Sequence, residues 1–190
     1  MKPAFYMRFL EGHNGRSLDR LGGLPTHLPE RFPRFTTYLG EEKEELAFIA
    51  QFYCTPDRIN LPGTLCVQLY QDSDVGEGGD PLPVAIKLPL GAKENTERAG
   101  VVFPGLSEYE ILWDAEDDPD VIPDNAYLTD EEVKLMQSKA GGIPYYTDDE
   151  LPPGHIYLFQ LCEEPADFNF AGRRAIVSLA PDGSLYTRLQ

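Results

Sequence analysis

The chain has 190 residues, with 32 Asp and Glu against 16 Lys and Arg, so its formal net charge at pH 7 is -16. This length suits one domain with a sizeable core. A negative field repels phosphate backbones and anionic lipid, so the charge argues against nucleic acid and membrane surfaces as partners and favours a basic protein.

Short apolar segments separated by turn residues predict a fold built mainly of β-strands. The 17 Gly and 17 Pro indicate many turns. The predicted strands cover residues 4–10, 46–53, 64–71, 83–88, 101–103, 108–113, 156–162, 173–179 and 184–189. Residues 46–53 (LAFIAQFY) are apolar apart from one Gln, which is typical of a strand buried on both faces. The last two strands flank a Pro-Asp-Gly turn and should form a hairpin.

Two proline-containing stretches and one helix complete the predicted elements. Residues 21–33 (LGGLPTHLPERFP) should form an ordered loop, and the acidic residues 114–124 (DAEDDPDVIPD) should run over the surface. A helix is predicted over residues 130–139, with Thr129 as N-cap and with Val133, Leu135 and Met136 on its buried side. The expected fold class is therefore α+β, mainly antiparallel β with few short helices.

Two similar segments indicate a tandem duplication of a β-rich half. Residues 21–25 (LGGLP) and 140–144 (AGGIP) each precede a strand with an apolar-Gln-apolar step, at Gln51 and at Gln160. Paired glycines can hold positive φ and Pro fixes the exit, so each copy should form a strained turn. A buried Gln needs polar partners, which the Gly-Gly-x-Pro loop is expected to supply. The half-repeats would span about 1–110 and 125–190.

The order of these motifs resembles the YwqG family of mainly bacterial proteins. The first set is GGLP from Gly22, LAFIAQF from Leu46 and LPGTLCVQLY from Leu61. The second set is SKAGGIP over residues 138–144 and IYLFQL from Ile156. The resemblance implies one YwqG-like domain over residues 1–190, an α+β fold with a duplicated β-rich unit, and no established chemistry.

The residues that usually carry catalysis or bind metals lack a recognisable spacing. The histidines lie in loops rich in Gly or Pro, without the spacing of paired metal ligands: His13, His27 and His155. No nucleophile elbow or phosphate-binding loop is present. We therefore predict no catalytic residue, metal site or cofactor.

The cysteines and the N-terminus favour the cytoplasm. Cys54, Cys66 and Cys162 are an odd number beside apolar runs, as expected of buried, reduced thiols. Arg8 and Glu11 break the first apolar stretch before it reaches the length of a signal-peptide core, and no stretch approaches the length of a membrane span.

The densest charge of the chain lies between Trp113 and Tyr127. Aromatic anchors among carboxylates suit a docking surface for an Arg/Lys-rich protein, although an ordinary solvated loop is the simpler alternative. The leading hypothesis is a non-enzymatic protein that captures a basic partner, in its concrete version an immunity protein that neutralises a toxin. The predicted partner-binding residues are Trp113, Asp114, Glu116, Asp117, Asp118 and Asp120.

Two other functions are compatible with the sequence. A small-ligand-binding protein or hydrolase would place its site between the half-repeats, in a cleft that holds His27 or His155 beside a carboxylate. A structural subunit of an assembly would instead expose apolar patches.

Overall fold

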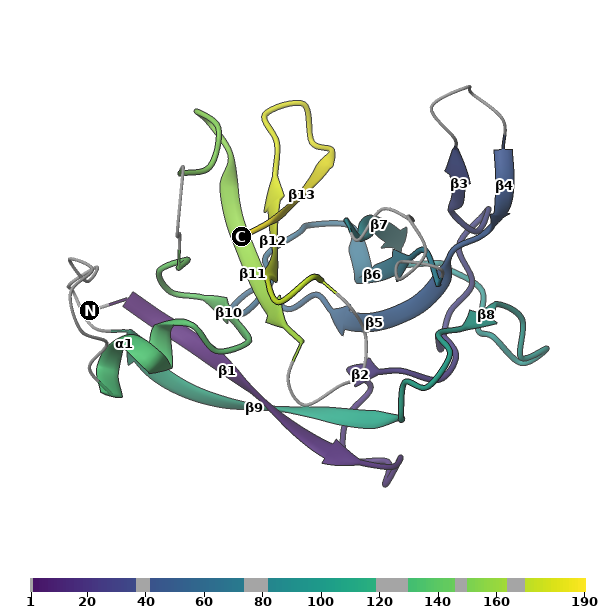
Figure 1. The fold of residues 1–190 in the computed structure, drawn as a ribbon, viewed down its shortest axis with the longest axis horizontal. Coiled ribbons are helices and arrows are strands. Elements are labelled where there is room, and N and C mark those ends of the chain that lie inside the picture. The colour runs from purple at the N-terminus through teal and green to yellow at the C-terminus, as the bar shows by residue number, and fades with distance from the viewer. Residues whose placement is uncertain (1, 37–41, 74–81, 119–129, 146–149, 164–169) are drawn as a thin grey trace.

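The computed structural model describes residues 2–36, 42–73, 82–118, 130–145, 150–163 and 170–190 (Figure 1). Its first strands are β1 (Lys2–Glu11), β2 (Arg20–Leu21), β3 (Arg34–Thr36), β4 (Glu42–Glu45), β5 (Ala47–Tyr53), β6 (Thr64–Gln71) and β7 (Val84–Pro89). The following elements are β8 (Val101–Val102), β9 (Tyr109–Asp118), α1 (Asp130–Leu135), β10 (Lys139–Gly141), β11 (Ile156–Cys162), β12 (Arg174–Leu179) and β13 (Leu185–Leu189). Each predicted strand is confirmed within a few residues, and so is the β12–β13 hairpin.

The fold is nearly all antiparallel β, so the predicted α+β class is wrong. The main sheet has the order β13-β12-β11-β10-β1-β9-β2-β5-β6-β7, and all of these neighbours are antiparallel. β8 pairs with β5 in parallel, and β3 and β4 form a separate hairpin.

The predicted helix over residues 130–139 is shortened to the six residues of α1. Lys139 and Ala140 instead pair with β1 and β11, because the sheet buries them completely and this outweighs local helix propensity. Leu135 is 2% exposed as expected, but Val133 is 47% exposed. Within the described ranges, no helix has the length and apolar character needed to cross a membrane.

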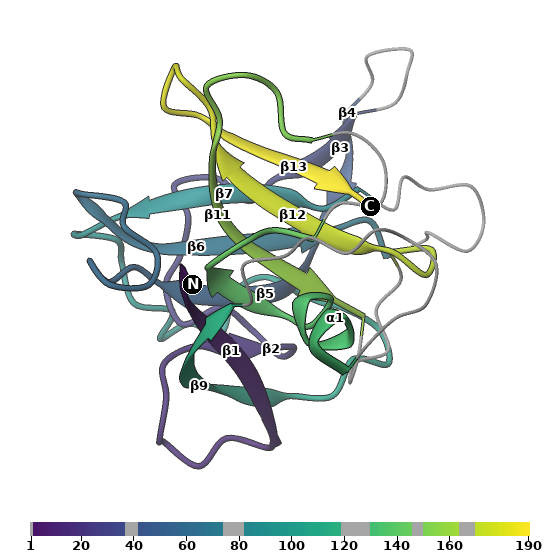
Figure 2. The same cartoon turned by 90° about the vertical axis from the view of Figure 1, so that its left-hand side faces the viewer.

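The main sheet curls until its two edge strands meet, so that it forms a near-closed barrel (Figure 2). β7 contacts β13, and Lys87 of β7 donates from Nζ to the carbonyl oxygen of Gly183 in the turn before β13. Phe52 of β5 and Phe159 of β11 pack across the interior with their ring centroids 4.6 Å apart. One hydrophobic core therefore contains side chains from both halves of the chain, from Leu21 to Val177.

The strand order has the same form when it is followed from either end of the sheet. β1 and β9 lie side by side at its centre, where β1 also pairs with β10 and β9 with β2. Outward from this centre, β2-β5-β6-β7 corresponds to β10-β11-β12-β13. The N-terminal strand β1 thus pairs with β10, which begins the later set of strands, and β9 pairs with β2, which begins the earlier set. The half-repeat boundaries and the single-domain assignment stay predictions.

Backbone hydrogen bonds match between the two sets of strands. Ile111 N donates to Asp19 O at 3.0 Å, and Met7 N donates to Ser138 O at 2.9 Å. Asp19 and Ser138 each directly precede the strand that leads into a Gly-Gly-x-Pro turn. The central strands are therefore fastened to the two turns in the same way.

The strained turns predicted at the two Gly-Gly-x-Pro segments are confirmed. Gly22 and Gly23 have φ of +73° and +68°, and Gly141 and Gly142 have φ of +65° and +70°. A Cβ on Gly22 would overlap the backbone oxygen of Ser107, and one on Gly142 would overlap the carboxylate of Asp118. Both the conformation and the space therefore require glycine at these positions.

The predicted link between these turns and the buried glutamines is also confirmed. In both copies the residue after Pro donates its backbone N–H to the side-chain oxygen of the glutamine. The N···O distance is 3.3 Å from Thr26 to Gln51 and 3.1 Å from Tyr145 to Gln160. Both glutamines are fully buried, so each turn satisfies an amide that water cannot reach.

We expect Gly22→Ala to destabilise the protein more than Gly63→Ala. Gly63 has φ of +77° but open space at its Cβ position, so its substitution should cost only the backbone strain, about 1–2 kcal/mol. Gly22→Ala adds the overlap with Ser107 O and should cost about 1–3 kcal/mol more. Urea unfolding of both variants measures the difference, and equal losses would contradict the close approach.

Candidate functional site

Trp113, Asp114, Glu116, Asp117 and Asp118 of the predicted partner-binding residues lie on strand β9. The stretch predicted to run over the surface is therefore a strand over 114–118, in which residues 114–117 are exposed and Asp118 is not. The antiparallel pairing of Tyr6 with Asp114 and of Lys2 with Asp118 holds this acidic segment at the centre of the sheet. Asp114, Glu116 and Asp117 are exposed, whereas Asp118 is fully buried. Asp120 lies outside the described residues. The structure thus separates the residues that the sequence groups together.

Trp113 is partly buried, and neighbouring side chains already contact its indole. Its Nε1 donates to Asp19 Oδ2 at 2.5 Å, and the Arg58 guanidinium lies 4.3 Å from the centroid of its ring system. The indole also packs edge-on against Phe52. A protein partner would have to displace Arg58 to reach the indole face that Arg58 covers.

Two of the three exposed acids are paired with cations. Asp114 Oδ2 lies 3.0 Å from Arg8 Nε, and Glu116 forms an ion pair with Lys134. Asp117 makes no ion pair with another described residue. Paired charges cancel at a distance, so this strand steers a basic partner less strongly than its sequence suggests.

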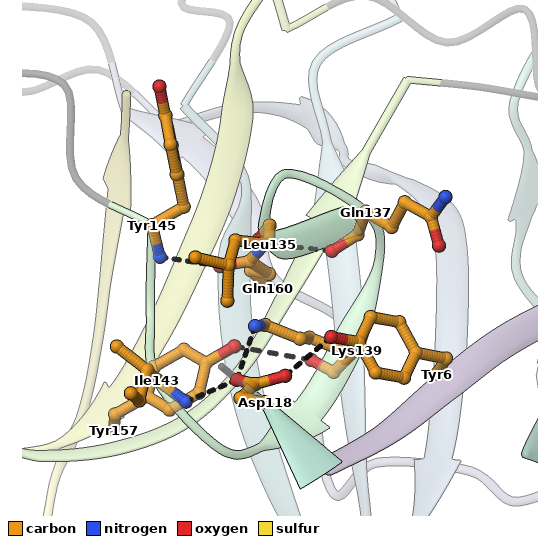
Figure 3. Close-up of polar contacts among 9 residues, drawn as sticks. All are labelled: Tyr6, Asp118, Leu135, Gln137, Lys139, Ile143, Tyr145, Tyr157 and Gln160. Atoms are coloured by element: carbon orange, nitrogen blue, oxygen red, sulfur yellow. Dashed lines mark hydrogen bonds and ion pairs between the residues drawn. The ribbon is translucent and has the colours of Figure 1, made fainter. Parts of the chain in front are cut away.

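The buried end of β9 forms a polar cluster with its neighbours, which we call the Asp118 cluster (Figure 3). Asp118 accepts hydrogen bonds from Lys139 Nζ at 2.6 Å, from Ile143 N at 2.6 Å and from Tyr6 OH at 2.5 Å. Lys139 and Asp118 are both fully buried. Burial lowers the pKa of Lys139, and its bond to Asp118 opposes this effect. The cluster fastens β1, β9 and β10 to the second Gly-Gly-x-Pro turn.

A cleft of about 670 Å³ opens beside the first Gly-Gly-x-Pro turn. This volume is typical of small-molecule sites. The basic and acidic side chains that line the cleft are His13, Arg20, His27, Glu94, Arg98 and Glu108. A cleft with His27 near carboxylates is what the small-ligand hypothesis predicts. Its lining residues, however, all come from the first set of strands and its loops, and not from between the half-repeats.

One wall of the cleft presents three polar groups within hydrogen-bonding distance of one another. Tyr53 OH lies 2.8 Å from His27 Nδ1, and Thr26 Oγ1 lies 3.1 Å from the same nitrogen and 2.9 Å from Tyr53 OH. Behind them, Gln51 Nε2 donates to Thr26 Oγ1, and Gln68 Nε2 donates to His27 O at 2.8 Å. We call this group the Thr26–His27–Tyr53 triad.

A second wall is the β7–β8 connection, which is bonded to the turn. Asn95 N donates to Thr26 O at 2.8 Å, and Asn95 Nδ2 donates to Pro25 O at 2.9 Å. Asn95 Oδ1 accepts from Ala99 N at 2.8 Å, so one side chain also closes its own loop. The loop that carries Glu94 and Arg98 is therefore held in place before any ligand arrives.

The third wall is cationic and is backed by a buried carboxylate. Arg20 Nη1 donates to Leu24 O at 3.2 Å, and Arg20 Nε is buried without a hydrogen-bond partner. His13 lies beside Arg20, and its Nδ1 is 3.0 Å from Glu110 Oε1. Burial raises the pKa of Glu110, but backbone N–H donors and His13 outweigh it and the net direction is downward.

The groups near the cleft are suited to binding more than to nucleophilic attack. Burial raises the pKa of Cys54 to about 11 and that of Cys66 to about 12, so both free thiols are protonated at neutral pH. Burial likewise raises the pKa of the Tyr53 hydroxyl. Over the described ranges, no three His, Cys, Asp or Glu side chains are placed to hold a metal ion.

No protein-family model matches the chain, and no curated protein matches it. The resemblance to the YwqG family therefore stays a prediction. The localisation of this protein in the cytoplasm also stays a prediction.

Sequence reasoning pointed to the first turn and to His27 but missed most of the cleft. Arg20 and Tyr53 lie in or beside strands, where they look like ordinary sheet residues. Glu94 and Glu108 lie in connections far along the chain that only folding brings to the turn. The Gly-Gly-x-Pro motif was the one signal in the sequence that marked this place.

We expect Asp118→Asn to destabilise the protein by about 3–5 kcal/mol, because it leaves the buried Lys139 ammonium unpaired. The matched control Asp117→Asn changes an exposed neighbour and should stay within about 0.5 kcal/mol. Adding Lys139→Met to Asp118→Asn should recover part of the loss. Chemical denaturation measures all three variants, and a loss at Asp118 no larger than at Asp117 would contradict a paired, buried cluster.

Proposed function

We propose that this protein is a binding protein for a small polar ligand, which occupies the cleft beside the first Gly-Gly-x-Pro turn. The observation that carries the proposal is the Thr26–His27–Tyr53 triad, which faces a cleft of about 670 Å³ and is held from behind by buried glutamines. Small-molecule sites generally combine such a concave space with a few fixed polar groups.

Preorganisation supports this proposal. Gln51 and Gln68 are fully buried, and Tyr70 OH donates to Gln68 Oε1 at 2.7 Å, so the amides behind the triad have fixed orientations. On the opposite wall, Asn95 binds the turn and its own loop. Fixed polar groups lose little conformational entropy when a ligand binds, which favours affinity.

We propose binding and not hydrolysis because the groups around His27 form a weak catalytic set. His27 Nδ1 shares its hydrogen-bonding capacity with Thr26 and Tyr53, and no carboxylate among the described residues bonds to the His27 ring. A general base in a catalytic triad normally has an acid partner that orients it. The raised pKa of Tyr53 also disfavours its ionised form.

The proposal predicts thermal stabilisation by a ligand that depends on the triad. Polar metabolites would be screened for an increase in Tm, where a ligand at 100 times its Kd adds about 2.7 kcal/mol and each kcal/mol raises Tm by about 2–4 °C. His27→Ala/Tyr53→Phe should abolish the increase. His155→Ala removes a histidine of the second set of strands, outside the cleft, and should keep it. An increase that survives in the triad variant would place the ligand elsewhere.

Capture of a basic protein, including toxin neutralisation by an immunity protein, is the second candidate function. The net charge of -16 favours it, and the segments outside the described residues add acids without any Lys or Arg. Among the predicted contact residues, Asp114, Glu116 and Asp117 are exposed on β9. This proposal no longer relies on Asp118, which is fully buried, or on Trp113, which is partly buried and covered on one face by Arg58.

Charge reversal tests this second candidate. A basic partner would first be isolated by salt elution. The affinity for this partner at low salt should fall by about tenfold or more in the triple variant Asp114→Lys, Glu116→Lys and Asp117→Lys. The control reverses Glu30, Glu97 and Glu150, which are exposed elsewhere and give the same net charge. Calorimetric titration compares the two variants. Equal weakening by both would show that only the overall charge matters and that β9 is not the contact surface.

A further inference from the structure

The Asp118 cluster has an open counterpart in the cleft. Strand pairing places Arg20 opposite Gln51 and Lys139 opposite Gln160, so these two cations occupy matching positions next to matching turns. Each is followed by its Gly-Gly pair, in which Gly23 corresponds to Gly142. The backbone of the two sites is therefore arranged alike, and their side chains can be compared one by one.

A carboxylate lies against the second glycine in both sites. A Cβ on Gly142 would overlap Asp118, and a Cβ on Gly23 would lie 2.5 Å from Glu108 Oε1 and 2.6 Å from Glu108 Cδ. Glu108 therefore lies beside Gly23 as Asp118 lies beside Gly142, but Glu108 is exposed whereas Asp118 is fully buried. The two carboxylates reach these places from different positions along the chain.

The two sites differ in whether their charges are paired. In the second site, Asp118 accepts from Lys139 Nζ and from Ile143 N. In the cleft, the carboxylate of Glu108 forms no hydrogen bond or ion pair with the described residues, and neither does the N–H of Leu24, which corresponds to that of Ile143. Arg20 Nε is also buried without a partner. The first site thus presents a cation and a carboxylate that do not satisfy each other.

The remaining charges of the cleft are balanced in sign. Arg98 and Glu94 line it together with Arg20 and Glu108, which gives two guanidinium groups and two carboxylates in the lining, and Glu110 behind the lining is paired with His13. Arg98 has a left-handed backbone conformation with φ of 56°, an unusual and costly state for a residue other than Gly. Two hydrogen bonds between the Asn95 side chain and the backbone of Ala99 close the loop around this residue.

A balanced, unpaired set of charges selects for a ligand that carries both signs. A polyphosphate would meet two carboxylates, and a polyamine would meet two guanidinium groups, so either would bring like charges together in the cleft. A molecule with one carboxylate and one ammonium can pair with both kinds of group. The cleft volume of about 670 Å³ leaves room for an amino acid or a dipeptide.

We propose that the ligand is a small zwitterion of the amino-acid or dipeptide class, with its carboxylate bound by Arg20 and its ammonium by Glu108. This inference rests on the proposed function, because it names the ligand class of the same cleft. The ligand carboxylate pairs with the Arg20 guanidinium group and accepts from Leu24 N, both in the cleft lining, as the Asp118 carboxylate accepts from Lys139 and Ile143 N. The triad then contacts the rest of the molecule.

The test compares matched probes that differ only in charge. Amino acids and glycyl dipeptides are titrated into ¹⁵N-labelled protein beside their N-acetyl derivatives, which lack the ammonium, and their methyl esters, which lack the carboxylate. Zwitterions should shift the amides of residues 24–28 and 93–99, and either derivative should bind about tenfold more weakly or worse. Neutral sugars complete the panel.

Variants assign each charge to its partner. Arg20→Met should weaken the zwitterions to the level of their methyl esters, and Glu108→Gln should weaken them to the level of their N-acetyl derivatives. Arg20→Lys keeps the positive charge and should retain part of the affinity. Arg173→Met, which removes an exposed cation outside the cleft, serves as the matched control and should bind as the unaltered protein does.

The outcomes separate this inference from the proposed function. Sugars or singly charged derivatives that shift the cleft amides as strongly as the zwitterions would overturn the zwitterion assignment and leave the ligand cleft standing. Zwitterions that bind but shift amides elsewhere would overturn the assignment to this cleft. If no probe in the panel shifts the cleft amides, both the ligand class and the proposed function fail.

Discussion

Thr26 and Tyr145 each donate a backbone N–H to the side chain of a fully buried glutamine, and the rest of the fold depends on these two contacts. Each contact fixes a Gly-Gly-x-Pro turn over the outer face of a buried strand, where an unpaired amide would be costly. The turns in turn position Asp19 and Ser138, whose carbonyl groups hold the central strands β9 and β1. A loop rich in Gly and Pro thereby becomes one of the most constrained parts of the molecule.

The two turns lead to different local chemistry on similar backbones. At the second turn, the buried Lys139 is paired with Asp118, which also accepts a hydrogen bond from Tyr6 OH. At the first turn, Arg20 and Glu108 both line an open cleft, and His27 and Tyr53 face the same space. A paired charge that stabilises one part of the sheet corresponds to an unpaired charge that can recognise a ligand in the other. The contrast comes from side-chain identity and burial, since the backbone pairing is the same.

The acidic segment shows why charge density alone is a weak guide to a binding surface. Trp113 and Asp118 looked like parts of one docking patch, but a strand directs successive side chains to opposite faces and its neighbours decide which are covered. Pairing with β1 buried Asp118, and Asp19 with Arg58 engaged Trp113. What is left for a protein partner is a short row of exposed acids, two of which already have cations beside them.

The strands could be predicted from the sequence, because short apolar runs bounded by turn residues, such as residues 47–53 and 156–162, are typical of buried strands. The two turns could be predicted because Gly and Pro suit their backbone. The sequence also identified the need of Gln51 and Gln160 for loop partners. It overstated the helix, since local capping signals say nothing of the sheet positions open to Lys139 and Ala140. The pairing of the charges and the position of the cleft follow from the folded sheet, because long-range strand pairing brings Arg20 and the connections that carry Glu94 and Glu108 to one cleft, and no local pattern records this.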